Sequence, residues 1–155
     1  MRHSIILHTL IAACLVGFAA PNFAQEKKTV FNHVALSVYD LQKSASFYEE
    51  VLQLDTIAEP FKIGKHKWFE IGPGLSLHLV NDATEIKEHR RNTHICFSVI
   101  SIDEIIARLE KFGVAYYNVE KEQGKVGTRL DGVKQLYIQD PDGYWIEIND
   151  ERQGL

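Results

Sequence analysis

Two short stretches of the chain alternate apolar and other side chains with the two-residue period of a β-strand. Residues 33–41 read HVALSVYDL and residues 94–102 read HICFSVISI, so the leading histidine, a Ser-Val pair and the apolar positions recur 61 residues apart. Because successive side chains point to opposite faces of a strand, His33 and His94 are expected to face away from the apolar layer. The repeat predicts two equivalent strands in a duplicated chain.

Each predicted strand leads into an amphipathic helix. Asp40 and Ser101 are good N-cap residues, and Glu104 completes a capping box with Ser101. Apolar residues then recur at helical spacing, and Gly113 ends the second helix. The expected apolar stripes comprise Leu41, Ala45, Tyr48 and Leu52 in the first helix, and Ile102, Ile105, Ile106, Leu109 and Phe112 in the second.

Both halves end in a strand, a tight turn and a second strand, in residues 68–80 and 136–149. On the last strands the offset is 69 residues, so His78 corresponds to Glu147. The difference between the offsets of 61 and 69 places about eight extra residues in the second half, most simply in the polar stretch 118–132. We interpret that stretch as a candidate mobile loop.

These elements predict an α+β fold of two paired βαβββ modules, which form a cupped, eight-stranded mixed sheet with helices on one face. Module one covers about residues 30–82 and module two about residues 91–150, within a single domain of residues 25–155. The formal net charge is −4, with acidic and basic residues interspersed, so nucleic acid is not expected as a partner.

The first 24 residues have the layout of a secretory signal: Arg2 precedes an apolar run over residues 5–20, and Ala24 is a candidate cleavage site. The run is shorter than the roughly 20 residues that span a bilayer. We therefore expect a periplasmic or secreted protein without stable membrane association after cleavage; an uncleaved anchor or lipidation at Cys14 are the alternatives. Export leaves Cys96 as the one cysteine of the mature chain, which excludes an internal disulfide.

The polar face of the predicted sheet carries four residues with metal-binding side chains: His33, His78, His94 and Glu147. Equivalent positions in two modules related by a pseudo-twofold axis converge, so we expect these four side chains to meet at one site. Three imidazoles and one carboxylate suit a divalent transition metal, namely zinc, nickel, iron, cobalt or manganese. Calcium and magnesium fit poorly because they prefer oxygen ligands.

The remaining polar and aromatic residues are assigned by their pattern. His66 and His89, in charged segments without strand periodicity, are expected at the solvated surface. Cys96 is interpreted as a small pocket-lining residue, with a fifth metal ligand or a redox-sensitive thiol as the alternatives. Four further residues are candidates either for a substrate pocket or for ordinary packing: Trp68, Tyr137, Trp145 and Arg129.

Four segments resemble the vicinal oxygen chelate superfamily, which includes glyoxalase I, fosfomycin-modifying enzymes, extradiol dioxygenases and bleomycin-binding proteins. They read HVALSVYDLQKSASFYEEVLQL, LSLHLV, THICFSV and DPDGYWIEI. The resemblance extends over about residues 31–149 and implies paired modules around a metal held by His33, His78, His94 and Glu147. It also implies a homodimer, which in some members assembles each metal site from both subunits.

The resemblance implies a glyoxalase-like lyase or isomerase that acts on a small substrate with vicinal oxygens. Glu147 is the candidate catalytic base, and His78, which stands where glyoxalase I enzymes generally carry an acidic or amide residue, is a ligand or a second base. An exported protein meets little glutathione, which argues against lactoylglutathione as the physiological product. Two alternatives stay open: an iron(II) extradiol-type dioxygenase with His33, His94 and Glu147 as iron ligands, and a binding or sequestering protein like the bleomycin-binding relatives.

Overall fold

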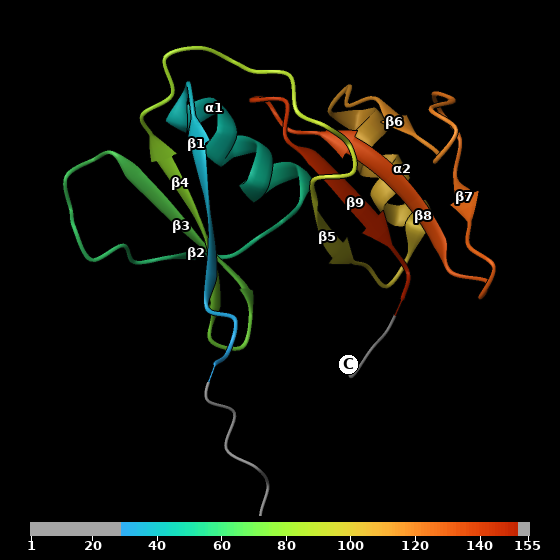
Figure 1. Cartoon of the computed structure of the whole chain (residues 1–155), viewed down its shortest axis with the longest axis horizontal. Helices are drawn as coiled ribbons and strands as arrows, with labels where there is room; N and C mark the ends of the chain where they lie inside the picture. Colours follow the sequence, from blue (N-terminus) through green and yellow to red (C-terminus); the bar gives the residue numbers. More distant parts are fainter. Residues whose placement is uncertain (1–28, 152–155) are drawn as a thin grey trace, which may run out of the picture. The chain divides into compact units, whose positions relative to one another are not determined.

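The computed structural model describes residues 29–151, so the predicted signal in residues 1–24 lies outside the described residues. Within the described part, the strands form two hydrogen-bonded sheets, one in each predicted module (Figure 1). Module one contains β1 (His33–Val38), α1 (Leu41–Ser46), the π-helical turn η1 (Phe47–Val51), β2 (Thr56–Ile57), β3 (His66–Gly72) and β4 (Leu75–Asn81). Module two contains β5 (His94–Ser98), α2 (Ile102–Lys111), β6 (Tyr116–Tyr117), β7 (Gly127–Thr128), β8 (Lys134–Gln139) and β9 (Trp145–Asn149).

Both helices begin where the sequence predicts. The side chain of Asp40 accepts a hydrogen bond from the backbone N–H of Lys43, and the hydroxyl of Ser101 accepts one from the backbone N–H of Glu104. These bonds satisfy backbone donors that a helix leaves unpaired at its first turn. The first helix then widens into η1, where the N–H of Leu52 donates to the carbonyl of Phe47. The helical pattern of the sequence did not predict this change of period.

The predicted α+β fold of two similar modules is confirmed, with a difference in the sheet. The strand order is β1-β4-β3-β2 in the first sheet and β5-β9-β8-β6 in the second, with β7 also paired to β8. Each sheet is mixed, because β1 and β4, and likewise β5 and β9, run parallel while their other neighbours run antiparallel. The described strands therefore form two separate sheets of four and five strands, where we predicted one sheet of eight.

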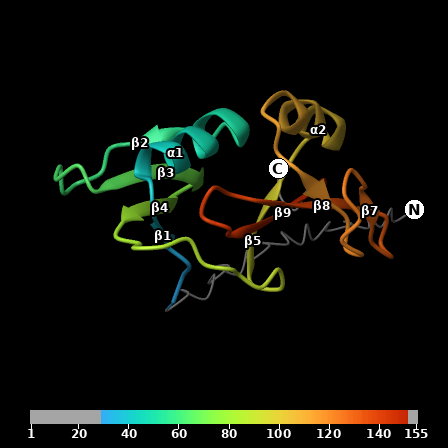
Figure 2. The same cartoon turned by 90° about the horizontal axis from the view of Figure 1, so that it is seen from above.

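The core lies between the sheets and the helices, and α1 and α2 lie on the same side of their sheets (Figure 2). The apolar face of the last strand of each module is fully buried, at Leu77 and Leu79 in β4 and at Ile146 and Ile148 in β9. Phe112 was predicted to extend the apolar stripe of α2 but is 39% exposed, because it lies at the C-cap where the helix ends. None of the helices in residues 29–151 is long and apolar enough to cross a bilayer.

The eight extra residues of module two do lie between residues 118 and 132, but this stretch is held by hydrogen bonds. Asn118 is buried and its side chain bonds both the backbone and the carboxylate of Glu122. Gly127 and Thr128 form β7 against β8. The predicted mobile loop thus contributes the two residues of β7 to the second sheet.

The turn between β8 and β9 joins the two modules. The carboxylate of Asp142, which is 4% exposed, accepts hydrogen bonds from the backbone N–H of Tyr39, at 2.7 Å, and from the hydroxyl of the fully buried Ser44. Asp140 accepts a hydrogen bond of 2.8 Å from the hydroxyl of Tyr48. Two carboxylates of module two thus hold three donors of module one.

This contact makes stability depend on pH. Burial raises the pKa of the Asp140 carboxyl to about 6, although the hydrogen bond from Tyr48 acts in the opposite direction. Because the folded chain holds this proton more tightly than the unfolded chain, in which an aspartate titrates near ~3.9, the stabilisation is complete at low pH and is lost as pH rises through about 6. The free energy of unfolding of Asp140→Asn should therefore rise relative to that of the wild type as the pH is raised from about 4 to 7.5. We expect this relative gain to be on the order of 2–3 kcal/mol.

Urea unfolding of both proteins at a series of pH values measures this difference, with the exposed residue Asp55 changed to asparagine as the matched control. Parallel pH profiles for the wild type and Asp140→Asn would contradict the prediction.

Candidate metal centre

The four predicted ligands occupy equivalent positions in the two sheets. In the parallel pair β1 and β4, Ala35 lies opposite His78, and in the parallel pair β5 and β9, Cys96 lies opposite Glu147. His33 and His94 each lie two residues before these partners, so each shares a sheet face with the ligand on the neighbouring strand. The duplication seen in the sequence is therefore also present in the register of the parallel strand pairs.

The first pair of ligands, His33 and His78, is called half-site one. Their rings stack with centroids 4.5 Å apart, and the other face of His78 stacks on Trp68 at 3.5 Å. His33 Nδ1 lies 2.7 Å from the side-chain oxygen of Asn32, which leaves its Nε2 for another partner. His78 Nε2 lies 2.8 Å from the hydroxyl of Ser76. These contacts fix the orientation of both imidazoles.

The surroundings of His78 in half-site one favour the neutral form of its imidazole. Burial lowers the pKa of His78, and the charges of His33 and His66 lower it further. A neutral imidazole has the lone pair that a metal ligand needs. The surroundings of His78 thus fit both roles predicted for it, those of a ligand and of a base.

The second pair, His94 and Glu147, is called half-site two. His94 Nδ1 lies 2.7 Å from the backbone carbonyl of Arg91, and because a carbonyl only accepts, Nδ1 must carry a hydrogen. His94 Nε2 then faces Glu147 Oε2 at 3.2 Å. Two lone pairs do not face each other stably, so this contact needs either a proton on Nε2 or a shared cation. A histidine whose other nitrogen donates to a carbonyl is the usual arrangement of a metal ligand.

The carboxylate of Glu147 is buried and held on both oxygens. The hydroxyl of Tyr137 donates to Oε2 at 2.8 Å, and the amide of Asn149 donates to Oε1 at 3.1 Å. Burial and the neighbouring Glu147 raise the pKa of Tyr137 to about 12, so the phenol stays protonated and remains a donor. Burial and the same carboxylate raise the pKa of the Cys96 thiol to about 12, and the choice between a pocket-lining thiol and a metal ligand stays a prediction.

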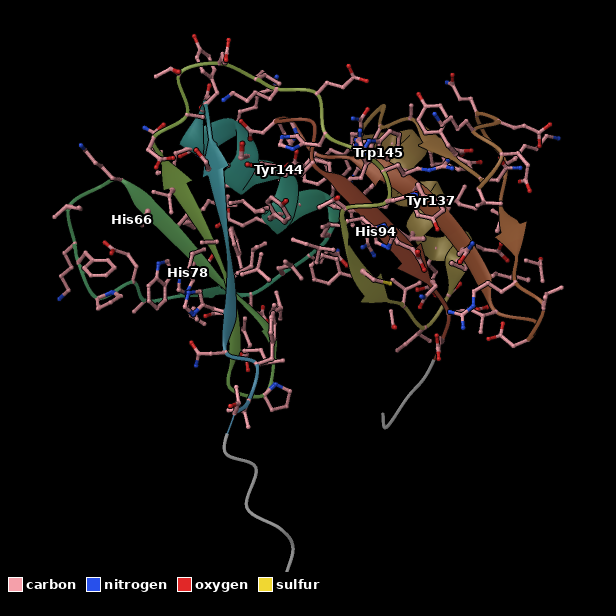
Figure 3. All side chains as sticks on the ribbon, viewed as in Figure 1. His66, His78, His94, Tyr137, Tyr144 and Trp145 are labelled. Atoms are coloured by element: carbon pink, nitrogen blue, oxygen red, sulfur yellow. The ribbon has the colours of Figure 1, made fainter. Side chains whose placement is uncertain are left out.

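The two half-sites lie in separate modules. Figure 3 shows His78 on the first sheet and His94 on the second. Within residues 29–151, no group of three or more His, Cys, Asp or Glu side chains is placed to hold a metal ion. The chain thus brings the predicted ligands together as two pairs, and a single site with all four ligands stays a prediction.

Several assignments outside the four ligands change. His66 is the first residue of β3 and is partly buried against Phe61, with ring centroids 5.2 Å apart, and His89 stacks on Tyr144 at 4.0 Å; both were predicted at the solvated surface. The aromatic neighbours responsible are distant in sequence or lie in a loop, so periodicity did not indicate them. Arg129, a candidate anion-binding residue, bonds the carboxylates of Asp131 and Glu151.

One residue of the site was not predicted. The guanidinium of Arg91 lies 4.9 Å from the centre of the Tyr137 ring and donates to the backbone carbonyls of Asn118 and Val119. It thereby connects half-site two to the extra stretch of module two. The only sequence signal for this role was the position of Arg91, three residues before His94, in the segment that leads into β5.

Comparison with known proteins agrees with this fold. A family model described as the Glyoxalase/Bleomycin resistance protein/Dioxygenase superfamily matches residues 30–148. A lactoylglutathione lyase of Pseudomonas putida is 28% identical over 86% of this chain and 92% of its own length, and the metallothiol transferase FosB of Shouchella clausii is 31% identical over 76% and 77%.

Among solved structures, the oxidase ChaP-H2 matches with a TM-score of 0.63 at 23% identity, covering 83% of this chain and 98% of its own. This likeness concerns the fold, and the names of the three similar proteins describe three different reactions. The family match covers both modules and all four candidate ligands. The chain therefore belongs to the Glyoxalase/Bleomycin resistance protein/Dioxygenase superfamily.

Proposed function

We propose that this protein is a divalent-metal-dependent, glyoxalase-like lyase or isomerase that acts on a small molecule with two vicinal oxygens. The observation that carries the proposal is the matched geometry of the half-sites. Each places two candidate ligands on neighbouring parallel strands, in the same register, with ring nitrogens already oriented by outer hydrogen bonds. Similarity to a lactoylglutathione lyase over most of both chains supports the same class of reaction.

The donor set fits a transition metal. His33, His78, His94 and Glu147 would hold it, because three imidazoles and a carboxylate suit zinc, nickel, iron, cobalt or manganese. When bound, such a cation supplies Lewis-acid polarisation of the two substrate oxygens.

The protein side chains supply the proton transfer. Glu147 is the candidate base that accepts a proton from the carbon next to a substrate carbonyl. Tyr137 and Asn149 each donate to one of its oxygens, so the carboxylate is oriented before substrate binds. His78, kept neutral by its surroundings, is a candidate second base on the opposite half-site.

We further propose that the protein is a homodimer in which half-site one of each subunit meets half-site two of the partner. Each half-site offers only two ligands, and His33 and His94 are exposed in the single chain. A twofold axis that joins unlike half-sites generates two identical four-ligand sites. Export to the periplasm or the exterior stays a prediction, since the signal lies outside the described residues.

Reconstitution tests the function. The purified protein is loaded separately with nickel, zinc, cobalt, manganese and iron(II), and each form is assayed for isomerisation of hemithioacetals of methylglyoxal with small thiols and for oxygen consumption with catechol. We expect near-stoichiometric metal and isomerase activity without oxygen uptake. Oxygen uptake by the iron form alone would favour the dioxygenase alternative, and failure to bind any metal would favour a binding protein.

A further inference from the structure

The two half-sites differ in the aromatic residue that lies opposite the ligand of the last strand. In β3, Trp68 lies opposite His78, and in β8, Tyr137 lies opposite Glu147. The two aromatic residues are thus counterparts in the duplicated fold, but their contacts differ in kind. Trp68 covers the face of its ligand with an indole ring, whereas Tyr137 donates a hydrogen bond to its ligand.

Aromatic rings extend from half-site one toward the protein surface. The ring of Phe61 meets Trp68 edge to face, with centroids 6.2 Å apart, and is 59% exposed. Its backbone N–H donates to the carboxylate of Glu59 at 2.9 Å, which holds this part of the chain between β2 and β3 in place. Phe61 and Trp68 together, called the ring platform, extend the His33–His78 stack to the surface.

In the proposed dimer, the half-site that faces this platform is half-site two of the partner, and it is polar. Half-site two presents the Tyr137 hydroxyl, the Glu147 carboxylate and, over the Tyr137 ring, the guanidinium of Arg91. A substrate that occupies a site with one apolar and one polar wall is held in a single orientation only if its own two ends differ in the same way.

We propose that the substrate carries a flat apolar group, preferably an aromatic ring, next to its vicinal oxygens, and that the ring platform receives this group. The inference rests on the proposed metal-dependent function, because the platform borders half-site one. Stacking on Trp68 and burial of Phe61 favour a ring over a methyl group at this place. The part of the Phe61 ring that is exposed in the single chain is then covered when substrate binds.

Two metal chelators of matched chemistry test the proposal. Acetohydroxamate and benzohydroxamate both offer two vicinal oxygens, and only the second carries a ring. Their affinities for the metal-loaded protein are measured by calorimetry for the wild type, Phe61→Ala, Trp68→Leu and Trp68→Phe. Phe112→Ala, which removes an exposed ring from the C-cap of α2 in module two, is the matched control.

We expect benzohydroxamate to bind the wild type about tenfold more tightly than acetohydroxamate. Phe61→Ala should bring this ratio close to one while the affinity for acetohydroxamate and the metal content stay near wild type. Trp68→Leu should also bring the ratio close to one, and it is compared at equal metal occupancy because Trp68 stacks on the candidate ligand His78. Trp68→Phe, which keeps a ring, should retain most of the preference, and Phe112→Ala all of it.

A wild-type ratio near one, or a ratio that Phe61→Ala and Trp68→Leu leave unchanged, would overturn the ring platform while the metal-dependent function stands. A change in oligomeric mass with an unchanged ratio would assign Phe61 to a subunit contact and would also overturn it. Loss of binding for both hydroxamates in the wild type would refute the proposed function itself, and the inference with it.

Discussion

We expect His78→Ala and Glu147→Gln each to reduce metal affinity by about 100-fold or more, because loss of an outer hydrogen-bonding partner alone costs about 10–100-fold and a direct ligand contributes more. Glu147→Gln retains an oxygen that can accept from Tyr137, so the local packing is largely preserved. Competition titration with a coloured chelator measures the affinity, and elemental analysis measures the content. Glu110→Gln, the same change at an exposed position of α2, is the control.

We expect that mixing the two variants restores part of the metal binding. If each site combines half-site one of one subunit with half-site two of the other, a mixed dimer of His78→Ala and Glu147→Gln has one site with all four ligands and one with both changes. Random pairing makes half of the dimers mixed, so about a quarter of all sites recover. The subunits are mixed by co-expression with two different tags, and the doubly tagged dimer is purified.

Recovery in the doubly tagged dimer therefore reports where the ligands of one site come from. The same dimer without metal would mean that each site is built within one chain, since every site would then lack one ligand. Unchanged metal content in the two single variants would refute the four-ligand site itself.

We expect Asp142→Ala to lower the free energy of unfolding by about 3 kcal/mol, since a donor left without its acceptor costs about 1–3 kcal/mol and this change removes the acceptor of two donors. The donors are the backbone N–H of Tyr39 and the hydroxyl of Ser44, both in module one. The loss should therefore weaken the contact between modules, with little effect on the secondary structure of either. Urea unfolding followed by circular dichroism measures it.

Asp131→Ala is the control for Asp142→Ala, because Asp131 is an exposed aspartate whose partner, Arg129, also bonds Glu151. A double-mutant cycle with Ser44→Ala isolates the bond between Ser44 and Asp142. Additive effects of the two changes, or a loss for Asp142→Ala no larger than for Asp131→Ala, would contradict the proposed role of this carboxylate.

The elements that sequence predicted well are those set by local rules. The caps at Asp40 and Ser101 and the alternation along β4 and β9 follow from the spacing of residues within one segment. The equivalence of His78 and Glu147 follows from the comparison of two such segments. They also sufficed to place two candidate ligands on each sheet.

What the sequence did not reveal depends on residues far apart in the chain. The bonds from Tyr48 to Asp140 and from Ser44 to Asp142 join positions more than 90 residues apart, and no periodicity marks them. The pairing of the modules also depends on residues far apart in the chain. Alternation predicts which face of its own sheet a ligand occupies, but not which face of another module lies against it. This is why four ligands predicted to share one site are found as two pairs.

The equal registers of the ligands in the two sheets also have a historical meaning. A single module that paired with a second copy of itself would carry the same ligand positions on both sides, and so a symmetric site suited to a symmetric ligand. Once the two copies became one chain, each could change alone. At the site, the two modules now differ in histidine against glutamate at positions 78 and 147, and in indole against phenol at positions 68 and 137. Making the two residues of each pair identical, one pair at a time, would test which difference makes the two sides of the site chemically unlike.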